Sequence, residues 1–401
     1  MKKLRASSKV GHNSKIGQNS KIGQNSKMGQ NSKMGHNSKM GHGLWMGHNS
    51  KTGHGLWMGH DLNIGGRSAG KCLLALGLTC ALSLGLVSCG QKDAAKTDTL
   101  KIGLTVYDDS DTFLSQITEE IRSRAKEDSG PMKITVSAKG ADGSQRTQDE
   151  QVEELIASGC NILFVNLVDR TDPSNIIDLA RDNNVPIIFY NRELVKEDLM
   201  QWDKLYYVGA KAGQSAELQG QEIAAYIAAH PEVDSNGDGK IQYVMLKGEP
   251  GHQDAIIRSE KVVETLLAEG VELDKLSYEV ANWSRAQAEN RTSQLISEYH
   301  GQIELLISNN DDMALGAMDA YDQSNMTQNG RPAIFGIDGT KETLEAIRAG
   351  KVQGTVMNDA TGQADAMMDL AEQIFQGKDL SKLPLLNGKY IYIDYTIPQE
   401  N

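Results

Sequence analysis

Short apolar runs alternate with longer amphipathic segments along the chain from residue 100 onward. The short runs are rich in Val, Ile and Leu and are bounded by Gly, Asn and Asp, a pattern that predicts β-strands. Strands are predicted at 100–106, 133–137, 162–165, 185–190, 241–246, 303–308, 333–337 and 352–356, and helices at 113–126, 148–158, 216–229, 259–268, 286–299 and 363–375. The alternation predicts an α/β fold with doubly wound, mostly parallel sheets. The part of the chain after the signal segment has about 310 residues, which is large for a single sheet of this kind, so we expect two lobes.

The first 66 residues have a different character. Residues 11–64 repeat hexapeptides of the type Gly-His-Asn-Ser-Lys-Ile. Only the sixth position is regularly apolar, so the repeats bury too little surface to offset the entropy cost of ordering. We expect residues 1–66 to be disordered or to lie upstream of the true start, with Met58 as a candidate initiator.

Residues 67–89 have the composition of a secretory signal. A basic segment with Arg67 and Lys71 precedes an apolar run at 72–87, which is shorter than a membrane span needs. The sequence Leu-Val-Ser-Cys at 86–89 resembles the bacterial lipobox, which implies that Cys89 is lipidated and becomes the mature N-terminus. We therefore expect an extracytoplasmic protein, in the periplasm or at the cell surface, that a lipid anchors to the membrane.

Charge and cysteine content narrow the function further. Residues 89–401 contain 29 basic and 52 acidic residues, a net charge of −23. Nucleic-acid binding requires a basic footprint, so this charge argues against it. Cys160 remains alone after signal removal and lipidation, and we expect it to be a buried apolar side chain without a disulfide.

A loop before the predicted strand at 241–246 has the spacing of a calcium site. Oxygen-bearing side chains fall at positions 1, 3, 5 and 9 of an EF-hand-like loop, glycine falls at position 6, and position 7 offers its carbonyl. Position 12 is Met245 where an EF-hand has Glu, so a carboxylate from elsewhere must complete the shell. A solvated Asx/Gly turn is the alternative. The loop ligands are Asp234, Asn236, Asp238, Lys240 and Gln242.

Polar residues also follow several predicted strands where the strands end. His252 and Asp254 follow 241–246 at the start of a helix, and Arg258 lies one turn further on the same face. Asp254 could equally be a helix cap paired with Arg258. Because ligands of open α/β sheets bind at the carboxyl ends of strands, these groups predict a polar cleft between two sheets. Similar polar groups occur at 108–111, 166–169, 309–312, 338 and 358–359.

Such a cleft suits a sugar. Carboxylates, amides and guanidinium groups match the hydroxyls, which both donate and accept hydrogen bonds. Aromatic residues make up only 5% of the chain, so Phe113 and Trp283 at loop positions are candidates to stack on the C–H faces of a sugar ring, although either could belong to the core.

From about residue 99 to the end, the chain resembles the galactose- and glucose-binding receptors of bacterial ABC transport, which are periplasmic binding proteins of type I. The resemblance rests on Lys-Ile-Gly-Leu-Thr-Val-Tyr at 101–107, Asn-Leu-Val-Asp at 166–169, Leu-Tyr-Tyr-Val-Gly at 205–209, the loop at 234–242, Leu-Lys-Gly-Glu-Pro-Gly-His at 246–252, Ser-Asn-Asn-Asp at 308–311, Phe-Gly-Ile-Asp at 335–338 and Gly-Thr-Val-Met-Asn-Asp at 354–359. It implies a non-enzymatic, monomeric receptor for D-glucose or D-galactose whose closed form docks on an ABC-transporter permease, with a chemoreceptor as a candidate second partner.

The resemblance also implies roles for individual residues. Phe113 and Trp283 would sandwich the sugar ring, and Glu304 would complete a structural calcium site with the loop ligands. The implied hydrogen-bonding residues are Asp111, Asn166, His252, Asp254, Arg258, Asn310, Asp338 and Asn358.

The same resemblance implies three chain crossings between the lobes. We place them near residues 185–188, 358–359 and 389–390, which predicts lobe 1 at 99–187 plus 359–389 and lobe 2 at 188–358 plus 390–401. Two other functions stay open. One is a receptor for another monosaccharide such as ribose or xylose. The other is a glycosidase, which would need two carboxylates flanking a scissile bond.

Overall fold

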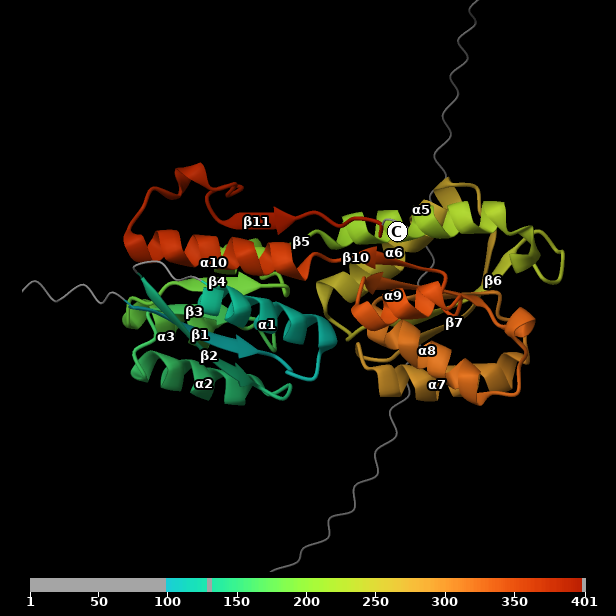
Figure 1. Cartoon of the computed structure of the whole chain (residues 1–401), viewed down its shortest axis with the longest axis horizontal. Coiled ribbons are helices and arrows are strands. Elements are labelled where there is room, and N and C mark those ends of the chain that lie inside the picture. Colours follow the sequence, from blue (N-terminus) through green and yellow to red (C-terminus); the bar gives the residue numbers. More distant parts are fainter. Residues whose placement is uncertain (1–98, 128–131, 399–401) are drawn as a thin grey trace, which may run out of the picture. The chain divides into compact units, whose positions relative to one another are not determined.

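The computed structural model describes residues 99–127 and 132–398, which form two α/β lobes (Figure 1). The repeats, the signal segment and Cys89 lie outside the described residues. Each lobe is built on one sheet whose strand pairs are all parallel. This confirms the predicted fold class. Within the described residues, no helix combines the length and the apolar character needed to cross a membrane.

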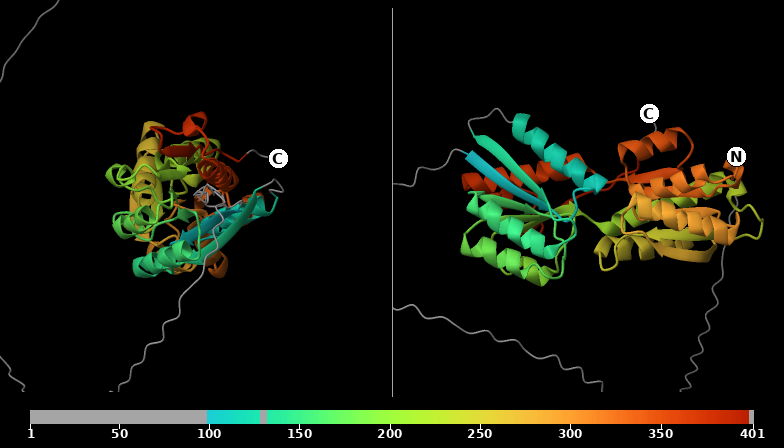
Figure 2. Two further views of the ribbon diagram at one scale, coloured as in Figure 1. Left: turned by 90° about the vertical axis from the view of Figure 1, so that its left-hand side faces the viewer. Right: turned by 90° about the horizontal axis from the view of Figure 1, so that it is seen from below.

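Lobe 1 has a six-stranded sheet in the order β11-β5-β4-β3-β1-β2. Alternate residues of its strands face opposite sides, so Ile162 and Phe164 join the core under α1 and α10, whereas Leu163 and Val165 join the core under α2 and α3 (Figures 1 and 2). The strands are β1 (Thr99–Val106), β2 (Lys133–Gly140), β3 (Ile162–Val165), β4 (Ile187–Tyr190), β5 (Leu205–Ala210) and β11 (Tyr390–Ile393), and the helices are α1 (Thr112–Glu127), α2 (Gln145–Ala157), α3 (Ser174–Asp182), α4 (Lys196–Leu199) and α10 (Ala360–Gln376).

Lobe 2 has a five-stranded sheet in the order β10-β9-β8-β6-β7. Val244 and Leu246 of β6 face α7 and α8, while Tyr243 and Met245 face α5 and α6. The strands are β6 (Ile241–Lys247), β7 (Leu273–Val280), β8 (Leu305–Ser308), β9 (Ala333–Asp338) and β10 (Gly354–Met357), and the helices are α5 (Ala212–Ala229), α6 (Gln253–Ala268), α7 (Arg285–Tyr299), α8 (Asp311–Gln323) and α9 (Lys341–Arg348). Short 3₁₀ turns occur at Pro231–Val233, Gln328–Gly330 and Leu380–Lys382.

Two of the predicted chain crossings are wrong. β4 pairs with β3 and β5, and β11 pairs with β5, so all three belong to the sheet of lobe 1. The chain therefore enters lobe 2 between β5 and α5, and leaves lobe 1 for the last time after β11, where Thr396 bridges to Met357. The remaining crossing lies between β10 and α10, at residues 358–359. The physical reason is that a short apolar run identifies a strand but does not determine which sheet it joins.

Cys160 is buried, as predicted, and its thiol is free within the described residues. Its Sγ lies close to Gly103 of β1, where a Cβ atom would stand 3.2 Å away. The thiol thus fills space beside β1, an interior strand of the lobe 1 sheet.

Candidate functional site

One pocket is lined by residues from the strand ends of both lobes. Lobe 1 contributes the loops after β1 and β4, and lobe 2 contributes the loops after β6, β7, β8 and β9. Eight of the ten predicted sugar-binding residues lie in this pocket. The complete lining is Tyr107, Asp111, Phe113, Asn191, Arg192, His252, Asp254, Arg258, Trp283, Asn310 and Asp338.

Helix starts fix two of these residues. His252 is the N-cap of α6 and its Nδ1 accepts a hydrogen bond from the amide of Asp254 at 3.1 Å. Asn310 is the N-cap of α8 and its Oδ1 accepts from the amide of Met313 at 3.0 Å. Each cap satisfies an amide that has no partner within its helix, so the same contact that starts the helix orients the side chain.

The capping contact also determines the protonation of His252. Nδ1 acts as an acceptor, so the proton of the neutral ring is on Nε2 and is free to donate. Burial, together with the charges of Arg192 and Arg258, lowers the pKa of His252 well below its ordinary value. The ring is therefore neutral at physiological pH.

Three carboxyl groups line the pocket, of which Asp254 and Asp338 are buried and Asp111 is partly buried. Asp111 accepts from the amide of Leu114 at 3.0 Å and from the hydroxyl of Tyr107 at 3.0 Å, and Asp254 pairs with Arg258 at 3.2 Å. Burial raises the pKa of Asp111, Asp254 and Asp338, and these partners only partly oppose it. A ligand hydroxyl that donates to any of them would favour its ionised form.

Arg258 is almost fully buried and hydrogen-bonds to several residues around the site. Its Nη1 donates to the carbonyl of Asn309 at 2.7 Å, and its Nη2 donates to the hydroxyl of Tyr395 at 2.9 Å. Its Nε and the Oδ1 of Asp254 are buried without a partner among the described residues. Buried polar atoms usually find partners, so this donor and this acceptor are candidates for contact with a ligand.

Trp283 and Asp338 hold strained backbones. Their φ values are 65° and 132°, in a region that residues with a Cβ rarely adopt. The ring of Trp283 meets the edge of His252 at a centroid distance of 5.0 Å, and Phe113 is also buried in the lining. Strain of this kind persists where the surroundings impose it, and it is common at ligand sites.

Two predicted residues stand behind the pocket and do not line it. Asn166 is fully buried, and its Nδ2 donates to the carbonyl of Tyr190 and to the Oδ1 of Asn191, each at 3.1 Å. Asn358 donates to the Oδ1 of Asp338 at 3.2 Å. Both therefore orient a lining residue. Asn191, to which Asn166 donates, is itself among the lining residues.

The sequence prediction missed Tyr107, Asn191 and Arg192. The last two directly follow β4, so the rule that found the other strand ends also applies to them. The predicted crossing at 185–188 overlaps the start of this strand, so the sequence prediction does not treat residues 191–192 as a strand end of lobe 1. Arg192 is 3% exposed and stacks on Tyr107, with its guanidinium carbon 3.6 Å from the ring centroid.

The predicted calcium loop folds back on its own side chains. Asp234 accepts hydrogen bonds from the amides of Gly237 and Gly239 at 2.8 and 2.9 Å, and Asp238 accepts from the amide of Lys240 at 2.8 Å. Asn236 accepts from the amide of Asp238 at 2.8 Å. These bonds hold the loop in a tight turn.

Glu304 reaches this loop from the start of β8, as the resemblance implied. Its Oε1 accepts from the amide of Ser235 at 2.7 Å and its Oε2 from the amide of Gln242 at 3.0 Å. In the described part of the chain, no group of three or more His, Cys, Asp or Glu side chains forms a ready metal site. The predicted donors here combine three carboxylates with amide and backbone oxygens.

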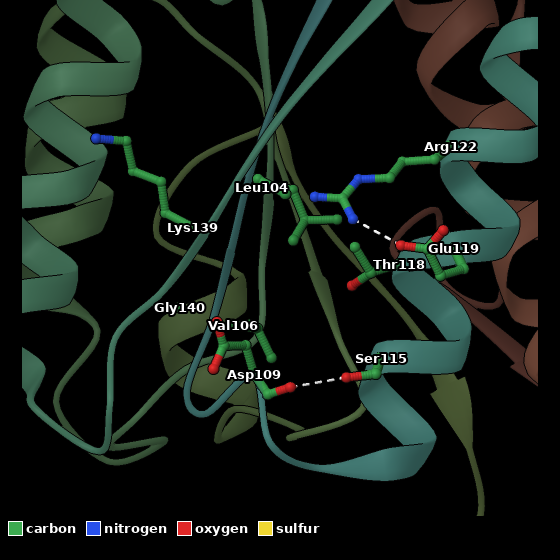
Figure 3. Close-up of a pocket in the computed structure, with 10 residues that line it drawn as sticks. Leu104, Val106, Asp109, Ser115, Thr118, Glu119, Arg122, Lys139 and Gly140 are labelled. Atoms are coloured by element: carbon green, nitrogen blue, oxygen red, sulfur yellow. Dashed lines mark hydrogen bonds and ion pairs between the residues drawn. The ribbon is translucent and has the colours of Figure 1, made fainter.

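A further cavity lies on lobe 1 between α1 and strands β1 and β2 (Figure 3). Its floor is Leu104 and Val106, and Glu119, Arg122 and Lys139 stand at its sides. Glu119 and Arg122 pair with each other at 2.6 Å. None of its described lining residues has a buried polar atom without a hydrogen-bond partner. This cavity therefore lacks the unpaired donor and acceptor atoms found in the pocket between the lobes.

Two α/β lobes with a polar pocket between their strand ends define a two-lobed ligand-binding protein. The chain belongs to the periplasmic binding protein family. The model of this family, described as a periplasmic binding protein domain, matches residues 102–379.

Individual relatives agree with this assignment. The chain is 36% identical over 305 residues to the D-galactose/methyl-galactoside binding periplasmic protein of Haemophilus influenzae, covering 76% of this chain and 89% of the relative. It is 29% identical to the xylitol-binding protein of Mycolicibacterium smegmatis, covering 80% of this chain and 84% of the relative. An ABC-transporter solute binding protein from Bacillus halodurans, solved with myo-inositol, is similar in structure, with a TM-score of 0.62, 25% identity and coverage of 74% and 93%.

Proposed function

We propose that the protein is an extracytoplasmic receptor that binds D-galactose or D-glucose between its lobes and delivers it to an ABC-transporter permease. The single observation that carries the proposal is the composition of the pocket. Its lining combines polar groups with two aromatic rings. The polar groups are carboxylates, arginines, amides and a neutral histidine, and the rings are those of Phe113 and Trp283. A pyranose has hydroxyls that donate and accept and C–H faces that are apolar, and this lining complements both.

The roles of the residues follow from their positions. Asp111 and Asn191 on lobe 1, and Asp254, Asn310 and Asp338 on lobe 2, provide acceptors and amide donors. Arg258 and the Nε2 of His252 donate. Sugar contacts from both lobes favour the closed form only by as much as they differ between the open and closed forms. The identity of the sugar is supported by the Haemophilus influenzae relative.

We infer binding without turnover. Glycoside hydrolysis requires a free acid and a base or nucleophile flanking the scissile bond. In this pocket Asp254 is paired with Arg258, and Asp111 accepts from Tyr107 and the backbone. Incubation with nitrophenyl glycosides tests this inference directly, and release of nitrophenol above the uncatalysed rate would contradict it.

We propose a structural calcium ion in the loop at 234–242. Its donors would be the side chains of Asp234, Asn236, Asp238, Gln242 and Glu304 and the carbonyl of Lys240. The oxygen-only donor set fits a hard cation that takes six to eight oxygen ligands. When bound, the ion would offset the repulsion between the carboxylates and pin the loop. None of these residues lines the pocket between the lobes, so the ion takes no part in sugar recognition.

Attachment and delivery complete the proposal. A lipid on Cys89 would keep the monomeric receptor at the membrane, near the permease that takes up the sugar. Presentation of the closed form to a chemoreceptor would use the same binding step and differ only in the partner.

Calorimetric titration of the sugar-free protein with D-galactose, D-glucose, D-ribose and D-xylose tests the function. We expect at least one of the two hexoses to bind with micromolar or tighter affinity. Tight binding of ribose or xylose alone would replace the proposed sugar. Absence of heat with all four would contradict a monosaccharide receptor of this kind.

A further inference from the structure

One buried arginine connects the two lobes at the edge of the pocket. Arg192 follows β4 of lobe 1, and its Nη2 donates to the Oε2 of Glu249 at 2.7 Å. Glu249 lies in the loop between β6 and α6 of lobe 2. The Nη1 of Arg192 donates to the carbonyl of Val168 at 2.8 Å, on its own lobe. The guanidinium group thus forms one hydrogen bond to each lobe.

The environment of this pair makes it sensitive to the separation of the lobes. The side chain of Arg192 is 3% exposed and that of Glu249 is 41% exposed. A buried guanidinium without its counter-charge is costly, whereas the same group in water is not. Separation of the lobes removes the carboxylate, while Tyr107 and Val168 of lobe 1 still contact the guanidinium group of Arg192 and leave its charge without its counter-charge. The ion pair therefore favours the closed arrangement.

The same two residues stand beside ligand-facing groups. Arg192 directly follows Asn191, which lines the pocket. Glu249 begins a tight turn in which the amide of His252 donates to the carbonyl of Glu249 at 3.2 Å. The pair thereby sets Asn191 of lobe 1 opposite His252 of lobe 2.

The third nitrogen of the guanidinium group, Nε, makes no hydrogen bond to the described residues. The Nε of Arg192 is buried and has no hydrogen-bond partner among the described residues, and Arg192 itself lines the pocket. Nη1 and Nη2 are engaged, and the plane of the group is fixed by stacking on Tyr107. A fixed donor with no partner at a polar pocket is positioned for a ligand oxygen.

We propose that Arg192 couples ligand binding to lobe closure through two separate atoms. Its Nη2 and Glu249 form a latch, by which we mean the Arg192–Glu249 ion pair, that stabilises the closed form. Its Nε donates to an oxygen of the bound sugar. The second half of the proposal rests on the proposed function, whereas the latch operates between the lobes whether or not a sugar is bound. Glu249 is a positioning residue because it does not line the pocket.

Two substitutions separate the two roles. Glu249→Gln removes the latch charge and keeps Nε, whereas Arg192→Lys keeps a charge that can pair with Glu249 and removes Nε. Glu260→Gln is the matched control, because Glu260 is exposed on α6 and makes the same change of charge. Each protein is titrated with galactose and glucose at low and high NaCl. Sugar release is followed by stopped-flow fluorescence.

We expect Glu249→Gln to weaken sugar affinity by roughly tenfold, a loss expected for a half-exposed pair. The loss should appear in a faster release rate, and the salt dependence of affinity should fall below that of the wild type, because the screened interaction is gone. Arg192→Lys should also bind more weakly but keep the salt dependence. Glu260→Gln should behave as the wild type in both respects. A Glu249→Gln affinity and release rate equal to those of the control would overturn the latch, and wild-type affinity in Arg192→Lys would overturn the ligand contact.

Small-angle X-ray scattering of the sugar-free proteins tests the latch independently of any sugar. We expect Glu249→Gln to have a larger radius of gyration than the wild type and Glu260→Gln at low salt. An unchanged radius, together with unchanged release, would refute the latch. If the wild type binds no monosaccharide, the proposed function fails and the scattering comparison alone decides whether the latch exists.

Discussion

Because Gly248 has no side chain, the ring of Trp283 can lie directly against its backbone. A Cβ atom built on Gly248 would stand 2.2 Å from the Cη2 and Cζ2 atoms of Trp283. The backbone of Gly248 is not in the left-handed region, so an alanine there meets only the ring and no conformational penalty of its own. Gly248→Ala therefore moves one aromatic wall of the pocket with a single methyl group.

The size of the effect follows from these distances. Ordinary contacts between carbon atoms begin near 3.5 Å, so the ring must move by about 1 Å. His252 blocks part of this movement, because its ring already meets Trp283 edge to face. Overpacking of this kind costs about 1–3 kcal/mol. If the cost falls on the ligand-bound geometry, sugar affinity should fall by roughly 5- to 150-fold.

Calorimetry with the preferred hexose measures the change in affinity, and thermal melting measures the change in stability. Gly213→Ala is the matched control, because Gly213 lies in the first turn of α5 and nothing stands within 4 Å of an added Cβ. This control should keep wild-type affinity and gain about 0.4–1 kcal/mol in stability from a more restricted unfolded chain.

A second variant keeps the prediction open to refutation if Gly248→Ala merely unfolds. In Gly248→Ala with Trp283→Phe, the smaller ring relieves the contact, so the double variant should bind more tightly than Gly248→Ala alone. Wild-type affinity in a folded Gly248→Ala protein would refute the reasoning, since the ring would then not be needed where the structure places it.

Three further predictions concern a buried acid, the proposed ion and the aromatic wall. Burial, with a smaller effect of Asp311, raises the pKa of Glu222 to about 8. The folded protein keeps this proton while the unfolded chain loses it near pH 4.5, so wild-type stability should fall as pH rises towards 8, and Glu222→Gln should show a shallower fall in melting temperature. Calcium should raise the melting temperature and a chelator should lower it, by an amount that depends on ion concentration; Glu304→Gln should abolish the difference, and an unchanged wild-type melt would refute the ion. Trp283→Ala should lose tight sugar binding in calorimetry and keep its far-ultraviolet circular dichroism, and full affinity in that variant would count against the site.

The sequence predicts most of the fold because its central strands are buried on both faces. Runs such as Ile162–Val165 and Ala333–Asp338 are fully buried and almost wholly apolar. By contrast, the predicted strands omit β5, β7 and β11. β7 and β11 are edge strands, and β7 has no buried residue, so its side chains carry little of the pattern that marks a strand. β5 is an interior and mostly buried strand, so its position in the sheet does not explain the omission.

Assignment of strands to lobes was beyond the sequence pattern. Parallel βαβ units look alike along a chain, and the pairing of β11 with β5 joins segments that are far apart in sequence. That pairing depends on the packing of the whole lobe. The crossing positions are therefore known only from the structure.

The candidate site was predictable where a polar residue caps a helix at a strand end, as His252 and Asn310 do. It was not predictable where two polar residues compete for the ligand-facing position. Asn166 and Asn191 both follow strands of lobe 1, and the structure places Asn191 in the pocket lining with Asn166 hydrogen-bonded behind it. A side chain's direction depends on such contacts, which sequence spacing does not contain.

The central claim is that one pocket between the lobes holds a monosaccharide. A crystal structure of the protein grown with saturating D-galactose or D-glucose tests it most directly. The account predicts the sugar ring between Phe113 and Trp283, with oxygen atoms within hydrogen-bonding distance of Asp254, Arg258 and Asn191. A sugar bound elsewhere on the molecule, or an empty pocket at saturating sugar, would contradict the claim.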